Sequence, residues 1–297
     1  MRIGVTLPLS DGDTLDGHPP TFDETSAFAR HAEAVGLDSI WVFDHLLFRY
    51  PGQPDEGVRE AWTTLAALAP LVPRVELGSL VMCSSFRHPG VMAKMAATLD
   101  DASGGRVLLG LGSGWHDPEY EAFGLPVDHR VGRFAEDLEI ATRLLRGERV
   151  TFSGRWRNTA DAALVPPPRR RVPVLVAADG ERMLRLTATW ADAWNTAWYG
   201  AVDATLQGRL TALDAACAAV ARDPATIRRT VGIRFHEPGS RHAGSSGVTT
   251  DAAGLAALFD DLAAHGVDDA IVWSTSKSAD AIERIADARR RHLGRPG

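Results

Sequence analysis

The chain has 297 residues, of which 45% are hydrophobic and 24% are charged, so it is long enough for one large α/β barrel or two ordinary domains. Its formal net charge of −6 argues against a non-specific nucleic-acid binder, because such a protein needs a basic face. A dense basic run, Arg169, Arg170 and Arg171, is expected to be a solvated loop. No nucleic-acid partner is therefore expected.

The two cysteines, Cys83 and Cys217, cannot form a disulfide framework. The N-terminus leads directly into a strand pattern, MRIGVTLPL, which is unlike a signal peptide. No segment approaches the roughly 20 apolar residues of a membrane span. These features predict a cytoplasmic protein without a membrane partner.

Two periodicities alternate along the chain. Short, mostly apolar β-rich runs, typical of strands buried on both faces of a parallel sheet, occur at 2–7, 38–43, 74–82, 105–111, 172–177, 191–196, 228–235 and 268–273. Helical patterns lie between them at 22–35, 59–71, 89–102, 130–146, 180–190, 202–222, 251–265 and 279–292. Eight strands alternating with eight helices predict a closed α/β barrel, the (β/α)8 or TIM barrel.

An open, doubly wound sheet is the competing architecture. It would place a glycine-rich dinucleotide fingerprint after the first strand, where this chain reads LPLSDGDTLDG. The later GLGSGW does follow a strand, but DPEYEAFGLPVDHR intervenes before the next helix. We therefore favour the barrel.

Two segments interrupt the alternation. Residues 147–171 look like a hairpin with a proline-rich return, inserted between the fourth helix and the fifth strand. Residues 236–250 are rich in glycine and serine, and we expect a mobile loop. Neither looks like a linker, because the alternation resumes in phase after each. We therefore predict a single barrel domain over residues 1–297.

Barrel enzymes work at the carboxyl ends of their strands. His45, beside Asp44 after the second strand, is the best candidate for proton or hydride-site chemistry, although a structural histidine is the alternative. Glycines around Ser113 allow a ligand to approach the main chain, or simply form a tight turn. Small residues before the helix at 180–190 favour an anion site, where Asp179 could instead be only an N-cap.

Metal and nucleophile chemistry are weaker interpretations. Several Asp–His and His–Glu pairs could bind a metal, but barrel metallohydrolases commonly place paired histidines after the first strand, where this chain has Leu7-Pro8-Leu9-Ser10. No metal site is therefore expected. Cys83 lacks an activating partner nearby in sequence, and the GSG after the fourth strand is not a nucleophile elbow.

An ordered set of motifs along nearly the whole chain resembles the luciferase-like monooxygenase family. The motifs are AEAVGLDSIWVFDHL, EAWTTLAALA, RVELGSLV, FRHPGVMAKMAATLDDASGGRVLLGLGSGW and ADGERMLRLTATWADAWNT. They are most similar to the branch that depends on coenzyme F420, an 8-hydroxy-5-deazaflavin. This resemblance implies an oxidoreductase that transfers a hydride between F420 and a small organic substrate. The alternatives are an FMN-dependent monooxygenase with the same barrel and a non-catalytic cofactor-binding barrel.

The resemblance also implies roles for individual residues. His45 would lie beside the deazaflavin ring, with Asp44 adjacent. A non-prolyl cis peptide at Leu80-Val81, followed by Met82, would bulge against the ring. The residues implied for the cofactor's phosphate and linker are Gly112, Ser113, Ala178, Asp179, Gly180 and Glu181.

The chain departs from the family at two positions. Relatives usually carry a glycine-rich run where this chain has Asp179, whose carboxylate would repel a phosphate unless it turned outward. The family's sugar-phosphate dehydrogenases place a glutamate where this chain has Trp115, which favours an apolar or aromatic substrate. We expect the substrate pocket to be lined by Arg49, Trp115, His116 and Trp198. The resemblance and the apolar helices at 59–71 and 89–102 also predict a homodimer.

Overall fold

The computed structural model describes residues 1–13, 17–238 and 246–294. Within these residues, parallel strands form a barrel that closes where β12 pairs with β1 and β9 pairs with β10. In chain order the barrel strands are β1 (Arg2–Thr6), β2 (Ser39–Val42), β3 (Glu76–Ser79), β5 (Val107–Gly112), β8 (Val174–Ala177), β9 (Ala193–Tyr199), β10 (Arg228–His236) and β12 (Asp269–Ser274). The predicted closed barrel is confirmed, and the open sheet is excluded.

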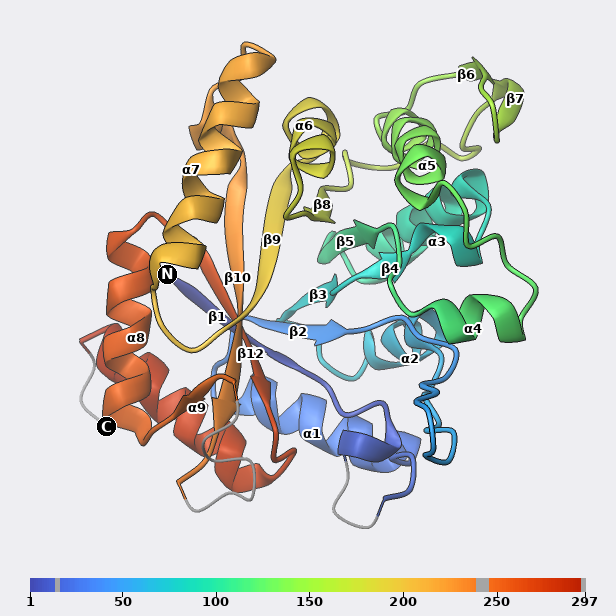
Figure 1. The fold of residues 1–297 in the computed structure, drawn as a ribbon. Helices are drawn as coiled ribbons and strands as arrows, with labels where there is room; N and C mark the ends of the chain where they lie inside the picture. The colour runs from blue at the N-terminus through green and yellow to red at the C-terminus, as the bar shows by residue number, and fades with distance from the viewer. Residues whose placement is uncertain (14–16, 239–245, 295–297) are drawn as a thin grey trace.

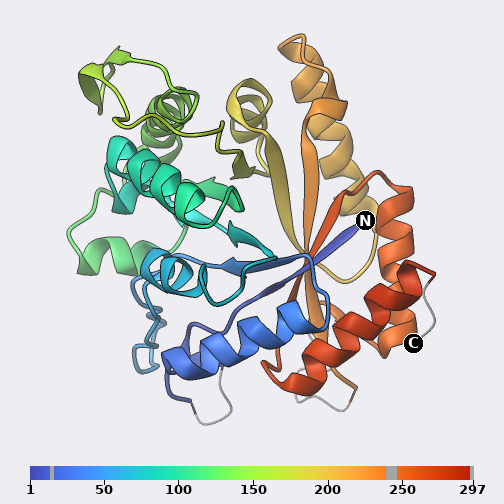
Figure 2. The same cartoon turned by 180° about the vertical axis from the view of Figure 1, so that it is seen from behind.

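Helices surround the strands on all sides in two opposite views (Figures 1 and 2). They are α1 (Phe22–Ala34), α2 (Ala61–Leu68), α3 (Pro89–Ala102), α4 (Asp117–Ala122), α5 (Arg130–Leu145), α6 (Glu181–Trp190), α7 (Ala204–Ala219), α8 (Ala252–Ala264) and α9 (Ala279–His292), with short 3-10 turns at Asp11–Asp13, Ser84–Phe86 and Pro224–Thr226. The sequence did not predict α4. Most of the others begin at a side-chain cap, such as the capping box that Thr21 and Glu24 form at α1.

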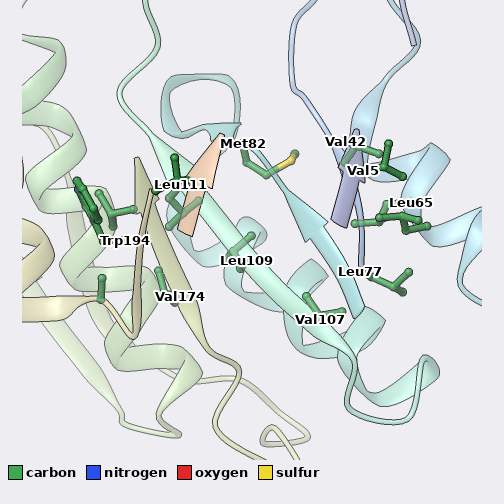
Figure 3. Close-up of a cluster of buried hydrophobic side chains, with 14 of the residues drawn as sticks. Val5, Val42, Leu65, Leu77, Met82, Val107, Leu109, Leu111, Val174 and Trp194 are labelled. Atoms are coloured by element: carbon green, nitrogen blue, oxygen red, sulfur yellow. The ribbon is translucent and has the colours of Figure 1, made fainter. Parts of the chain in front are cut away.

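The main core lies between the strands and the surrounding helices. In β5 the side chains alternate: Val107, Leu109 and Leu111 belong to this outer core, as Figure 3 shows, while Leu108 belongs to a separate cluster inside the barrel. This period of two is the ordinary geometry of a strand. Because helices cover the outer face and the barrel interior is packed, both faces need apolar residues, which explains the near-continuous apolar runs.

Trp41 fills the interior of the barrel and is fully buried. Two glycines make room for its indole ring, because a Cβ at Gly4 or Gly78 would lie 2.6 Å or 2.3 Å from Trp41 ring atoms. Its Nε1 donates a hydrogen bond to Ser39 Oγ at 2.8 Å, so the buried N–H is satisfied. The interior is therefore a packed core, and ligands are confined to the barrel's mouth.

The strand expected over residues 74–82 is broken. It ends as β3 at Ser79, continues through a cis Leu80-Val81 peptide, and resumes as β4 (Met82–Cys83), which pairs with β5. From the pair Gly78–Leu108 to the pair Met82–Leu111, four steps along this strand face three along β5, which defines a bulge. Glycines in β5 accommodate it, because a Cβ at Gly110 would lie 1.9 Å from Ser79 O and one at Gly112 would lie 2.5 Å from Val81.

The two irregular segments have different outcomes. As predicted, residues 147–171 contain an antiparallel hairpin, β6 (Val150–Ser153) with β7 (Asn158–Ala162), which packs beside α5 at the edge of the molecule (Figure 1). The expected mobile loop at 236–250 includes residues 239–245, which lie outside the described residues. The short strand β11 (Val248–Thr249) pairs with β10 after them. No described helix has the length and apolarity needed to cross a membrane.

Candidate active site

Two adjoining cavities lie at the carboxyl ends of the barrel strands. The first has a volume of about 350 Å³ and the second about 430 Å³. They share a wall made by Phe43, His45, Leu80, Trp115 and Trp198. The first cavity extends over the ends of β2, β5, β8 and β9, and the second extends toward β1, β10 and β12. This arrangement provides two binding spaces that meet at His45.

His45 is held by a buried carboxylate. Its Nδ1 lies 3.0 Å from Oε1 of Glu119, whose side chain is 1% exposed, and the other oxygen of Glu119 accepts a hydrogen bond from the N–H of Leu46 at 2.8 Å. A carboxylate can only accept, so Nδ1 carries the proton of this contact. In the neutral ring Nε2 then remains as a proton acceptor. Phe48 and Trp115 pack against the ring at centroid distances of 4.4 Å and 5.3 Å.

Asp44 lies on the floor of the first cavity and is buried. It accepts hydrogen bonds from the N–H of Cys83 at 3.0 Å and from the Arg87 guanidinium at 2.6 Å and 3.1 Å. Arg87 also pairs with Glu60, the N-cap of α2. Burial raises the pKa of the Asp44 carboxyl against the opposing effect of Arg87. The carboxylate of Asp44 beneath the cavity is therefore neutralised by the guanidinium of Arg87.

The bulge forms one wall of this cavity. Leu80 and Val81 line it, and their shared peptide is cis, as the family resemblance implied. Met82 does not line the cavity, because its side chain is fully buried in the outer core (Figure 3). A second non-prolyl cis peptide, Ala197-Trp198, borders the same cavity in β9 and was not anticipated.

The end of β8 brings Ala178 and Asp179 to the first cavity, beside the start of α6. Asp179 is not the helix cap: the cap position is Gly180, which provides no side chain, so the first amides of α6 have no side-chain partner. The Asp179 carboxylate instead accepts a hydrogen bond from Thr196 Oγ1 at 2.6 Å and lies 3.8 Å from Arg209 Nε. Gly180 and Glu181 do not line the cavity but open the helix beside it.

A tight turn after β5 completes the first cavity. Gly112 and Ser113 line it, and Tyr120 donates a hydrogen bond to Ser113 O at 3.0 Å. Gly114 has φ of +76°, and a Cβ there would lie 1.9 Å from the Tyr120 hydroxyl, so the turn requires glycine. Burial raises the pKa of the neighbouring Cys83 thiol to about 11, which suits a structural rather than a nucleophilic cysteine.

Of the four residues expected in the substrate pocket, two line the cavities. Trp115 and Trp198 line both cavities. Arg49 and His116 line neither: the Arg49 side chain is half-exposed and pairs with Asp55 at 2.6 Å, and His116 Nε2 accepts a hydrogen bond from the Arg49 N–H at 3.0 Å. Burial lowers the pKa of His116, in keeping with this acceptor role.

Glu119 is a site residue that sequence reasoning missed. It lies in α4, whose first turn contains Pro118 together with the acidic residues Asp117 and Glu119. Proline and acidic residues in a first turn mark the start of a helix, so the segment DPEYEA did carry a signal. Asn195 and Thr196 of β9 also line the first cavity and were not singled out as ligands.

A buried cation supports the second cavity. Lys277 follows β12, and its Nζ donates hydrogen bonds to Thr6 O at 3.0 Å and Thr6 Oγ1 at 2.7 Å, with Asp13 Oδ1 4.0 Å away. Thr6 and Asp13 both line the second cavity. Burial lowers the pKa of Lys277 to about 8.

This shift predicts a specific pH dependence of stability. Between pH about 8 and the ordinary lysine value of 10.5, the unfolded chain binds more protons than the folded chain, so the free energy of unfolding should rise with pH. Lys277→Met should lack this component, and urea denaturation of both proteins across the window measures the difference. Parallel pH profiles for the two proteins would contradict the assignment.

Comparisons with known proteins give a family match and several curated relatives. The family model described as luciferase-like monooxygenase matches residues 1–238. An F420-dependent glucose-6-phosphate dehydrogenase of Microbacterium testaceum is 34% identical over 197 residues, which cover 65% of this chain and 57% of that protein. A protein of the same name from Kineococcus radiotolerans is 30% identical over 287 residues, covering 90% and 84%.

The solved structure of an F420-dependent secondary alcohol dehydrogenase in complex with an F420-acetone adduct superposes with a TM-score of 0.81 at 19% identity, covering 97% of both chains, and supports the fold. The matched part of the chain spans about half the length of several curated relatives, between 46% and 57%. The family match covers residues 1–238, which is well over half of the chain. The chain therefore belongs to the luciferase-like monooxygenase family.

Proposed function

We propose that the protein is an oxidoreductase that transfers a hydride between coenzyme F420 and a small, apolar or aromatic substrate. The observation that carries the proposal is the position of His45, held by Glu119 on the wall that the two cavities share. One cavity would hold the cofactor and the other the substrate. The names of the curated relatives support F420 as the cofactor.

The first cavity has the features that a deazaflavin with a phosphate-bearing tail needs. The Leu80-Val81 bulge and Ala178 offer apolar surface for a ring, and Gly112 and Ser113 offer main-chain atoms. The uncapped start of α6 offers free amides and a helix dipole for an anion. Asp179 stands close to this anion position, but its carboxylate is engaged by Thr196 and lies near Arg209, which offsets its charge.

Each residue then has a distinct role. When bound, F420 supplies hydride transfer at C5 of its ring. His45 would accept or donate the accompanying proton at Nε2, because Glu119 engages Nδ1. Asp44 and Arg87 would support the cavity floor, and Trp115 would form an aromatic wall beside the substrate.

Trp115 and its neighbours indicate the substrate's character. The second cavity is lined by Phe43, Phe48, Tyr50, Trp115, Trp198 and Trp273. Such a wall favours stacking of a flat, aromatic molecule.

Cofactor titration tests the proposal directly. We expect the protein to bind F420 at least about tenfold more tightly than FMN, a difference of about 1.4 kcal/mol. Equilibrium titration with each cofactor, followed by absorbance and fluorescence, gives both dissociation constants. Tight FMN binding without measurable F420 affinity would instead support the FMN-dependent monooxygenase. Robust F420 binding without turnover across a broad substrate panel would support a cofactor-binding barrel.

We also propose that the protein is a homodimer. An apolar groove of about 560 Å³ lies between α2 and α3, lined among others by Trp62, Val91 and Met95, and Val91 is 53% exposed. Exposed apolar grooves of this kind commonly mark protein interfaces.

The free, buried Cys83 and Cys217 support a cytoplasmic location.

The groove yields a prediction about assembly. Light scattering at micromolar concentration should give a dimeric mass for the wild type and a monomeric mass for Val91→Asp, because burying an unpaired carboxylate in an apolar interface is costly. Val127→Asp is a suitable control, since Val127 is 42% exposed and does not line the groove. A monomeric wild type would contradict the proposal.

A further inference from the structure

Arg234 lines the second cavity near the carboxyl end of β10. It is in register with Trp273 of the neighbouring parallel strand β12, so both side chains face the same side of the sheet. Its guanidinium carbon lies 4.8 Å from the centroid of the Trp273 ring. The strands β9, β10 and β12 lie side by side (Figure 1). The ring centroid of Trp198 in β9 lies 5.8 Å from that of Trp273.

The Arg234 guanidinium has an N–H donor that no described residue accepts. Nη1 donates a hydrogen bond to Ser246 Oγ at 2.6 Å, whereas Nε is buried without a hydrogen-bond partner. Among the described residues no carboxylate pairs with this side chain. Of the two internal segments outside them, residues 239–245 (GSRHAGS) contain no acidic residue and residues 14–16 contain Asp16. Most arginines of the described barrel that are at least partly buried, such as Arg87 and Arg228, are paired with carboxylates. Arg234 therefore has no counter-ion in the part of the chain that the structure describes, and a partly buried cation in that state is stabilised by a ligand that supplies one.

The other charges around this cavity define where an anion could bind. Asp13 and Glu56 also line it. Asp13 Oδ2 already accepts hydrogen bonds from the N–H groups of Leu9 and Ser10 at 2.9 Å and 3.0 Å, and Glu56 Oε1 accepts one from Gly12 at 3.1 Å. These carboxylates would repel a negatively charged ligand, so the favourable position for an anionic group lies beside Arg234.

We propose that Arg234 is an anion-recognition residue of the second cavity and that the ligand of this cavity is an aromatic molecule bearing a carboxylate. The guanidinium would receive the carboxylate through two parallel N–H donors, the geometry that this pair prefers. The tryptophans of the cavity would hold the aromatic ring. The inference that this ligand is the substrate rests on the proposed function, whereas the binding preference can be measured without it.

The test uses 3-phenylpropionate and its neutral, nearly isosteric amide as probes. The full-length protein is titrated with each by calorimetry, with tryptophan fluorescence as a second signal. We expect the wild type to bind the acid about ten- to a hundredfold more tightly than the amide, because a charge-assisted pair replaces a neutral contact. Arg234→Gln should abolish this preference, and Arg234→Lys, which keeps the charge but loses the planar fork, should retain part of it.

Arg49→Gln is the matched control. Arg49 carries the same charge and stands in the sequence between Phe48 and Tyr50, which both line the cavity. Its side chain is half-exposed and pairs with Asp55, so the preference for the acid should persist in this variant. Equal affinity of the wild type for acid and amide, or an unchanged preference in Arg234→Gln, would overturn the proposal. If Arg234→Gln failed to fold, a full wild-type preference in Arg234→Lys would still count against two-donor recognition.

F420 titration of the same variants separates this proposal from the proposed function. Arg234 does not line the first cavity, so its substitution should leave F420 affinity unchanged. Failure of the wild type to bind F420 would refute the cofactor assignment while the preference for the acid could still hold. Conversely, F420 binding without a preference for the acid would refute only the role of Arg234.

Discussion

Replacing His45 with alanine should lower turnover by about 10²–10⁴-fold, the usual contribution of one positioned proton-transfer group. The side chain is only 12% exposed, stands on the wall between the two cavities, and is oriented by Glu119. F420 affinity should stay within about tenfold of the wild-type value, because the expected phosphate position at α6 lies elsewhere. Steady-state kinetics with an accepted substrate, together with a cofactor titration, measure both quantities.

Two variants make this experiment specific. Trp115→Ala should mainly raise KM, because it removes an aromatic wall and no proton. Glu119→Gln should lower turnover less than His45→Ala does, because an amide oxygen can still accept from Nδ1 and keep the ring oriented although the negative charge beside it is removed. An unchanged turnover in His45→Ala would show that the histidine is structural.

Replacing Arg87 with methionine should lower the free energy of unfolding by about 3–5 kcal/mol, because it leaves the Asp44 carboxylate buried without its partner. Asp44 is 3% exposed, so water cannot easily replace the lost contacts. The same change removes one contact of Glu60, the cap of α2. Urea denaturation at neutral pH measures the loss.

A double variant shows whether the buried charge is the cause. Adding Asp44→Asn to Arg87→Met should recover part of the stability, because the remaining amide carries no charge. Arg49→Met provides the control at an exposed pair and should leave stability unchanged within error. If Arg87→Met were as stable as the wild type, the buried pair would not support the cavity floor.

The barrel was readable from the sequence because its strands are covered on both faces, so apolar runs and helical stripes alternate with little ambiguity. The break inside residues 74–82 was not readable from this pattern, since Leu80, Val81 and Met82 are as apolar as a continuous strand. The family resemblance pointed to it, and the physical sign lies in another strand: Gly110 and Gly112 make room for the bulge.

Sequence position was enough to place those cavity residues that directly follow a buried barrel strand. His45 and Trp115 follow buried strands and do reach the cavities, whereas Arg49 turns outward to an aspartate that sequence spacing does not identify as its partner. Glu119 was missed because a six-residue helix gives too short a periodic pattern. Arg234 was missed because the absence of a carboxylate partner among the described residues is visible only in the structure.

The shared wall divides the mouth of the barrel into two regions that can change independently. Residues that border only the second cavity come mainly from the first and the last two barrel strands and the loops near them, among them Thr6, Arg234 and Trp273. Substitutions there can alter which molecule is accepted without touching the groups proposed to hold the cofactor. Mutational libraries restricted to these positions should therefore yield changed specificity at little cost to cofactor loading, so the fold offers a practical route to new substrates.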